Sequence, residues 1–171
     1  MMDIDRIRAD TPATSRLAYL HNAGAALMPV PVVGAMKRHL DLESEIGGYA
    51  AADRESDRLD AIYGSVARLL NAAPDEIALV ENATVAWQMA FYALPFRAGD
   101  RILTAEAEYA ANYVAFLQVA KRTGAIIEIV PSDASGELDI HALERMIDER
   151  VKLIAITWVP TNGGSSIRRR P

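Results

Sequence analysis

From residue 77 onward, short apolar runs alternate with longer segments in which apolar residues recur at helical spacing. The runs predict strands at Ile77–Val80, Arg101–Thr104, Ala125–Val130 and Lys152–Trp158, and the segments predict helices at Ala83–Leu94, Tyr109–Thr123 and Ile140–Glu149. The strands are almost continuously apolar, which is expected of strands covered on both faces. The alternation predicts an α/β fold with a mostly parallel sheet, flanking helices and right-handed crossovers.

The chain before residue 77 has a different pattern, in which helices dominate. A short helix is predicted at Ile4–Ala9, an extended segment at Leu17–Leu20, and a helix at about Val32–Leu40 after two prolines. A glycine break at residues 45–49 precedes a long amphipathic helix, Ala51–Asn71. The apolar residues of this helix share one face and are Leu59, Ile62, Tyr63, Val66, Leu69 and Leu70.

The composition is that of a globular protein with an acidic body. The 171 residues are 51% hydrophobic and 24% charged, which suits one domain with a sizeable core. The net charge is −5, and without the cluster Arg168–Arg170 the chain has 15 basic and 23 acidic residues, a charge of −8. An acidic body argues against nucleic-acid binding.

Cysteine is absent, which excludes disulfides, thiolate metal sites and a cysteine nucleophile within this sequence. The charged start lacks the apolar segment of a signal peptide. No stretch approaches the roughly 20 apolar residues of a membrane helix. We therefore predict a cytoplasmic protein with neither a metal site nor a membrane segment.

The turn after residue 80 is the first candidate for a binding site. The run Ile77–Val80 leads through Glu81 into a helix that starts with Asn82, Ala83 and Thr84. A helix start carries unpaired N–H groups and a partial positive charge, which favour an anion. Small residues let a phosphate approach the backbone, and the Thr84 hydroxyl can add a hydrogen bond. The alternative is that Asn82 only caps the helix.

Four motifs occur in the order found in one family of enzymes. They are Tyr19–Gly24 (YLHNAG), Asn82–Thr84 (NAT), Glu108–Asn112 (EYAAN) and Thr161–Gly164 (TNGG). Together they resemble the N-terminal part of the class V aminotransferase and cysteine desulfurase group, which are fold-type I enzymes that use pyridoxal phosphate. The resemblance covers residues 19–164 and implies the first part of the large domain of that fold, preceded by N-terminal helices.

The resemblance implies that three of these motifs hold the cofactor. The backbone amides of Ala83 and Thr84, with the Thr84 hydroxyl, would hold its phosphate. Tyr109 would stack on the pyridine ring at a position where the family has a histidine. Asn162 would donate a hydrogen bond to the phenolate oxygen. The structural alternatives are that Tyr109 only packs at a helix start and that Asn162 only forms a turn.

Two features concern the substrate. By the resemblance, Asn22 and Ala23 lie near the entrance for an amino-acid substrate, although the segment also suits an ordinary loop. Tyrosine cannot carry a proton near neutral pH as histidine does. Tyr109 therefore points away from true cysteine desulfurase chemistry and toward lyase-like or epimerase-like branches of the family.

The residues that complete such a site are not recognised in this sequence. In the family a lysine bonds to the cofactor and an acidic residue pairs with its ring, and both follow the fourth motif. The lysines here, Lys37, Lys121 and Lys152, match no such motif, so no catalytic residue is assigned. We interpret the chain as truncated and inactive alone, with a full-length homodimeric relative that performs C–S lyase, sulfur-transfer or transamination chemistry.

The predicted organisation has an N-terminal arm and helix at residues 1–50, a partial cofactor-binding α/β domain at 51–164 and an unstructured tail at 165–171. Two other functions stay open at this point. One is a module that binds a phosphate ligand, although no Walker or dinucleotide fingerprint is present. The other is a dimer-interaction fragment without catalysis.

Overall fold

The computed structural model describes residues 2–22 and 25–160, and none of the helices in these ranges is long and apolar enough to cross a membrane. The predictions for Ala23, Asn162 and the tail lie outside these ranges. Contacts divide the chain into two compact units, Met1–Leu79 and Val80–Pro171. The predicted domain boundary after residue 50 stays a prediction, because compact units and functional domains need not coincide.

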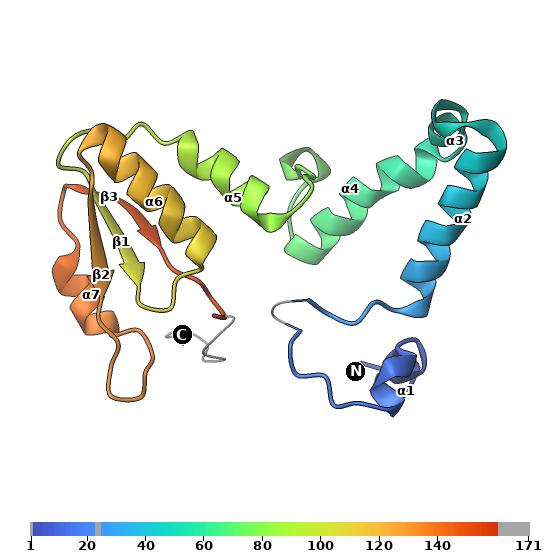
Figure 1. Cartoon of the computed structure of the whole chain (residues 1–171), viewed down its shortest axis with the longest axis horizontal. Helices are drawn as coiled ribbons and strands as arrows, with labels where there is room; N and C mark the ends of the chain where they lie inside the picture. Colours follow the sequence, from blue (N-terminus) through green and yellow to red (C-terminus); the bar gives the residue numbers. More distant parts are fainter. Residues whose placement is uncertain (1, 23–24, 161–171) are drawn as a thin grey trace. The chain divides into compact units, whose positions relative to one another are not determined.

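The first unit is built from helices (Figure 1). In chain order it contains α1 (Ile4–Ala9), the 3₁₀ turn η1 (Pro12–Ser15), α2 (Val30–Ile46), α3 (Gly48–Arg54), α4 (Ser56–Leu70) and the 3₁₀ turn η2 (Pro74–Glu76). The predicted helix at Ile4–Ala9 is confirmed. Pro29 and Pro31 stand at the start of α2, where proline is favoured. Gly47 ends α2 with a φ of +81°, a conformation that favours glycine.

The predicted helix Ala51–Asn71 is wrong as a single element, because the structure divides it into α3 and α4. Glu55 lies between them with φ −100° and ψ 11°. The sequence around this break, residues 53–58, is entirely polar, so no apolar side chain packs there to keep the helix continuous. Asn71 ends α4 in the left-handed conformation, with a φ of 54°.

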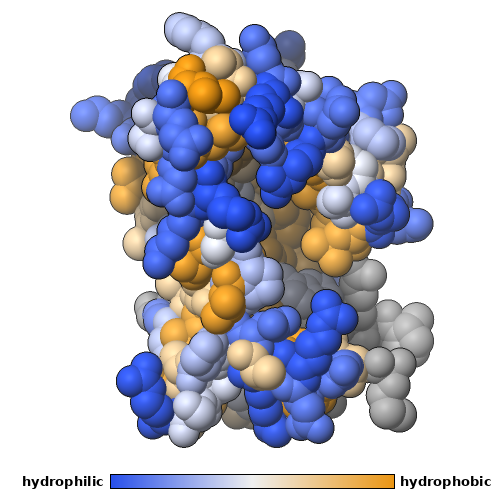
Figure 2. Space-filling model, turned by 90° about the vertical axis from the view of Figure 1, so that its right-hand side faces the viewer, coloured by the Kyte–Doolittle hydropathy of each residue, from blue (hydrophilic) through white to orange (hydrophobic). Residues whose placement is uncertain are grey.

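Apolar side chains of the first unit are mostly accessible to solvent. Among its described residues, Ala51 and Ala67 alone are buried. Tyr49 and Leu69 are 94% and 83% exposed. Figure 2 views the side on which α2 and α3 lie in Figure 1 and shows hydrophobic residues at several places on that surface. The helices of this unit therefore form with little core of their own.

The second unit is an α/β structure with a three-stranded parallel sheet (Figure 1). Its elements are α5 (Ala83–Tyr92), β1 (Arg101–Ala105), α6 (Ala110–Thr123), β2 (Ile126–Val130), α7 (Ile140–Met146) and β3 (Val151–Ala155). The strand order is β2-β1-β3, and Leu103 of the central strand pairs with Glu128 and Ile154 on its two sides. The predicted α/β class and parallel sheet are confirmed.

Two predictions about the strands are wrong. Ile77–Val80 forms no strand, because the segment has no ladder partner among the described residues. Nor is every strand covered on both faces. The central strand is buried from Arg101 to Thr104, whereas Ile126 of β2 and Ile154 of β3 are 44% and 41% exposed.

Two apolar clusters lie on opposite faces of the sheet, because neighbouring residues of β1 point to opposite sides. Ile102 packs with Phe91 of α5 and Phe116 of α6, whose ring centroids lie 5.4 Å apart. Leu103 packs on the other face with Ala142 of α7. Helices α5 and α6 therefore cover one face of the sheet, and α7 covers the other.

Candidate functional site

Polar side chains gather where β1 ends, which is the edge at which parallel sheets bind ligands. Thr104, the last residue but one of β1, is fully buried. The loop that follows carries Glu108, and α6 then begins with Asn112 in its first turn. Thr157 reaches the same place from the segment after β3. Three separate parts of the chain thus meet at this edge.

The Glu108 carboxylate is the centre of this cluster. One oxygen, Oε1, accepts hydrogen bonds from the Thr157 hydroxyl at 2.8 Å, from the Asn112 side-chain amide at 3.0 Å and from the Tyr109 backbone N–H at 2.7 Å. The other, Oε2, accepts from the Thr104 hydroxyl at 3.3 Å. Every partner is a neutral donor, so the carboxylate is held by hydrogen bonds rather than by an ion pair.

Tyr109 stands directly before α6 as its N-cap residue, with extended backbone angles φ −67° and ψ 129°. Its side chain is 51% exposed. The backbone is fixed by the bond to Glu108, while the ring remains accessible at the carboxyl end of the sheet. An accessible aromatic face can stack on a flat heterocycle.

The predicted phosphate turn forms the start of α5. The Asn82 side chain accepts a hydrogen bond from the Val85 N–H at 3.0 Å, so it does cap the helix. The N–H groups of Ala83 and Thr84 have no partner within the helix, since they belong to its first turn. Capping and anion binding are compatible, because the cap uses a different N–H group.

Helices α5 and α6 run side by side in the same direction, so both begin toward the end of the sheet where β1 ends (Figure 1). Trp87 and Phe116 join them, with ring centroids 5.3 Å apart. Thr84 and Tyr109 therefore lie at neighbouring helix starts. No hydrogen bond connects these two residues within the described ranges.

The remaining predicted site residues and the lysines lie in the first unit, at other positions of the α/β unit, or outside the described ranges. Asn22 is exposed in the first unit, and Ala23 and Asn162 are not described. All three lysines are exposed. Within the α/β unit, Lys121 lies in the last turn of α6 and Lys152 near the start of β3, both away from the carboxyl edge, while Lys37 belongs to α2 of the first unit.

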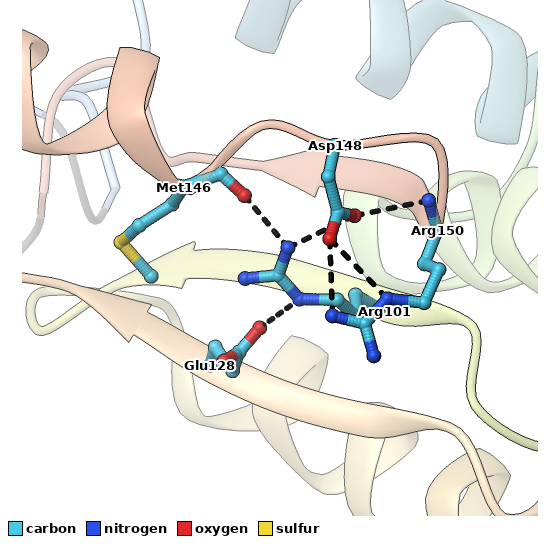
Figure 3. A network of polar contacts seen from close by, with 5 residues as sticks. All are labelled: Arg101, Glu128, Met146, Asp148 and Arg150. Atoms are coloured by element: carbon cyan, nitrogen blue, oxygen red, sulfur yellow. Dashed lines mark hydrogen bonds and ion pairs between the residues drawn. The ribbon is translucent and has the colours of Figure 1, made fainter.

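At the opposite end of β1, Arg101 forms a network of its own (Figure 3). Its guanidinium is almost buried and pairs with Glu128, with Asp148 at 3.0 Å and with the Met146 carbonyl at 2.7 Å. Hydrogen bonds to Glu128 and Asp148 raise the pKa of Arg101 above its usual value. Burial alone would raise the pKa of Asp148, but hydrogen bonds from Arg101 and Arg150 lower it overall. This network joins β1 to β2 and to the segment between α7 and β3, at the end of β1 opposite the candidate site.

Sequence reasoning missed the roles of Glu108 and Arg101. Glu108 was recognised only as the first letter of a motif, and Arg101 only as the start of an apolar strand. A charged residue that opens a buried strand is a usable signal, since a buried charge needs partners. The contact between Glu108 and Thr157 has no comparable signal, because it depends on the pairing of β3 with β1.

A parallel α/β layer with a polar cluster and an exposed aromatic ring at its carboxyl edge is the architecture of a ligand-binding domain. The family model described as aminotransferase class V matches residues 18–168. The chain therefore belongs to the class V aminotransferase family, which confirms the resemblance inferred from the motifs.

Similar proteins agree with this assignment. A probable cysteine desulfurase of Xylella fastidiosa is 34% identical over 170 residues, covering 92% of this chain and 41% of the relative. The solved cysteine desulfurase CsdA of Escherichia coli is 30% identical with a TM-score of 0.83, over 98% of this chain and 44% of that one. A mutant of C-DES with glycine covalently linked to its pyridoxal phosphate cofactor has the same fold, with a TM-score of 0.83 at 19% identity, over 94% of this chain and 43% of that one. The chain thus spans about 40% of the length of the curated relatives it matches.

Proposed function

We propose that this chain forms the part of a pyridoxal phosphate site that holds the phosphate and the ring, in a protein that acts on an amino acid. The observation that carries the proposal is the exposed Tyr109 ring, fixed at the carboxyl edge of the sheet beside the start of α5. Membership in the class V aminotransferase family supports it. The cofactor named for the C-DES structure supports it as well.

The described residues fit the cofactor in charge and shape. The N–H groups of Ala83 and Thr84, with the Thr84 hydroxyl, are donors at a helix start and suit a dianionic phosphate. The Tyr109 ring suits offset stacking on the pyridine ring. We expect Asn162 to donate to the phenolate oxygen, and Asn22 and Ala23 to lie near the substrate, as the resemblance implies.

When bound, pyridoxal phosphate supplies an electron sink for bonds at the α-carbon of an amino acid. The residues of this chain would bind and orient it, and Tyr109 would cover one side of the ring against water. Within the α/β unit, Lys121 and Lys152 stand at the ends of α6 and β3 away from the carboxyl edge, and no lysine of the sequence matches the family's motif for covalent attachment. We therefore expect the chain alone to bind the cofactor without covalent attachment and without turnover.

The reaction of the whole protein is a further part of the proposal. Its similar proteins include cysteine desulfurases, which supports a sulfur-containing amino acid as substrate. Tyr109 lacks the proton-transfer capacity of a histidine near neutral pH. We therefore favour C–S lyase or sulfur-transfer chemistry that needs no base at this position, and transamination is the remaining reaction class. We also expect a cytoplasmic homodimer.

Binding of pyridoxamine 5′-phosphate to the whole chain tests the proposal. This compound has no aldehyde, so it cannot react with surface lysines. Calorimetric titration is expected to show binding that inorganic phosphate weakens by competition. Thr84→Ala is expected to weaken binding of both compounds roughly tenfold, because it removes a hydrogen bond to a charged group.

Tyr109→Ala is expected to weaken binding of pyridoxamine phosphate roughly fivefold and to leave phosphate binding unchanged, because only the ring contact is lost. Thr14→Ala and Tyr49→Ala are matched controls at exposed positions in the first unit. The proposal fails if the unmodified chain binds no pyridoxamine phosphate, or if the controls weaken binding as much as the site variants do.

A further inference from the structure

Glu108 joins the loop after β1 to three other parts of the α/β unit through a single carboxylate. Thr104 belongs to β1, Asn112 to the first turn of α6, and Thr157 to the segment that leaves β3. The separation of Thr157 from Glu108 in the sequence is 49 residues, so the bond between them closes a long loop. These contacts converge on the residue directly before Tyr109.

Two of the four donors would lack a hydrogen-bond acceptor without the Glu108 carboxylate. The Thr104 hydroxyl is fully buried, and a buried hydroxyl without a partner is costly. The Tyr109 N–H precedes α6 and has no helical carbonyl to accept it, so the Glu108 carboxylate takes that place at 2.7 Å. A carboxylate only accepts, and it has enough lone pairs for all four donors. The position of Tyr109 is thereby set by its neighbour in the sequence.

We infer that Glu108 is a positioning residue that fixes the Tyr109 ring at the carboxyl edge and ties it to the exit of β3. The inference rests on the proposed function in one respect, namely that the Tyr109 ring contacts the ring of the bound cofactor. Glu108 itself contacts no ligand in this scheme, because its carboxylate oxygens are occupied by protein donors. Its effect on binding is exerted through Tyr109.

Three variants differ in how many hydrogen bonds of the Glu108 cluster they keep. Glutamine keeps the length of the side chain, and its amide oxygen can still accept from Tyr109 and Thr157, while its NH₂ group can donate to the Thr104 hydroxyl. Alanine removes every bond. Thr157→Val removes one donor and leaves Glu108 in place, so it weakens the link to β3 with little change in volume.

The first readout needs no ligand. Amide hydrogen exchange of the whole chain, followed by NMR, is expected to be roughly fivefold faster or more at the Tyr109 N–H in Glu108→Ala, since one hydrogen bond is lost. In Glu108→Gln the rate is expected to stay close to that of the unmodified chain. An unchanged Tyr109 rate in Glu108→Ala would overturn the inference, whatever the ligand experiments give.

The second readout uses pyridoxamine 5′-phosphate and inorganic phosphate as probes. Glu108→Ala and Thr157→Val are expected to weaken pyridoxamine phosphate binding several-fold, up to the roughly fivefold effect of Tyr109→Ala, without changing phosphate binding. When Tyr109 is already alanine, Glu108→Ala is expected to have no further effect on binding. A purely structural role would weaken binding equally in both backgrounds, and that result would overturn the inference.

Failure of the inference and failure of the proposed function are distinguishable. If the unmodified chain binds no pyridoxamine phosphate but the Tyr109 exchange rate responds to Glu108, the cofactor proposal fails and the positioning of Tyr109 stands. If binding occurs and depends on Tyr109 but not on Glu108, the cofactor proposal stands and the inference fails. Melting curves of Glu108→Gln and Thr157→Val test whether these variants remain folded, and both are expected to unfold cooperatively.

Discussion

The two compact units use similar amphipathic helices with different results. In α6, Phe116 and Val119 are 0% and 2% exposed because the helix lies against the sheet and α5. In α4, the apolar face predicted from the sequence includes Leu69 and Leu70, which are 83% and 63% exposed. An amphipathic pattern therefore does not by itself bury the apolar face of a helix, since burial requires a second layer of matching shape.

The two units are also stabilised by different kinds of interaction. The α/β unit has apolar clusters on both faces of its sheet and an arginine network that joins β1 to β2 and to the segment before β3. The helical unit has local features instead, such as the Asp3 cap of α1 and the glycine at the end of α2. Capping contributes about 1 kcal/mol in each case, which is less than a buried aromatic side chain contributes.

The largest expected effect comes from a core change in the α/β unit. Phe116→Ala is expected to lower the free energy of unfolding by about 3–5 kcal/mol, because it leaves a cavity under α5. Urea unfolding followed by tryptophan fluorescence measures this, since Trp87 lies against Phe116. Leu69→Ala in α4 is the matched control and should change stability by less than about 0.5 kcal/mol. If both variants lost a similar free energy of unfolding, the two units would not differ in how much their apolar side chains stabilise them.

A pair of glycine substitutions is expected to have smaller effects of opposite sign. Gly124, after α6, has a φ of +79°, and a Cβ there would lie 3.2 Å from the Cβ of Ala98. Gly124→Ala is therefore expected to cost about 1–2 kcal/mol. Gly64 lies within α4, where a Cβ meets only the end of the Arg68 side chain at 3.6 Å. Gly64→Ala is expected to stabilise that helix by roughly 0.5–1 kcal/mol.

Thermal melts followed by circular dichroism compare these two variants with the unmodified chain. Gly136→Ala controls for backbone strain alone, because Gly136 also has a positive φ, +83°, and no atom lies near its Cβ position. If Gly136→Ala costs as much as Gly124→Ala, the contact with Ala98 contributes nothing.

The smallest expected effect is the response to acid. The pKa of Asp148 is lowered from its usual 3.8, because hydrogen bonds from Arg101 and Arg150 outweigh its burial. A lowered pKa in the folded state stabilises the fold above the unfolded value, and the stabilisation is lost as pH falls below it. The urea midpoint of the α/β unit is therefore expected to fall between about pH 5 and pH 3.

Asp148→Asn is expected to make the urea midpoint depend less steeply on pH. Asp60→Asn on α4 is the control in the helical unit. The same series run at high salt separates hydrogen bonding from long-range charge effects, since salt screens only the latter well. An unchanged slope in Asp148→Asn would contradict the assignment of acid sensitivity to the Arg101 network.

Local signals were enough to predict much of the α/β unit. The apolar run at residues 101–104 and the helix that follows were placed to within a residue or two, since Gly124 marks the end of that helix. The predicted strand at Ile77–Val80 failed because an apolar run becomes a strand only where a neighbour accepts its hydrogen bonds. The break at Glu55 was missed because the polar residues 53–58 contain neither proline nor glycine to mark the end of a helix.

The candidate site was predictable only in part, for a related reason. Thr84 and Tyr109 stand at helix starts, which the sequence marks with small or polar residues. The partners of Glu108 come from β1, α6 and the segment after β3, and no local pattern connects them. A contact across 49 residues is set by strand order, which a single sequence does not specify.

The strand order β2-β1-β3 has a consequence for the way the chain folds. The segment from β1 through α6 to β2 is contiguous, so it can form as one unit soon after it is synthesised. The connection from β2 to β3 must instead run through α7 and cross β1 to reach the free side of that strand. The loop that joins β1 to β3 is therefore longer, and its closure is entropically slower. We therefore expect β3 to dock last, so that the Thr157–Glu108 bond forms at the end of folding and marks its completion.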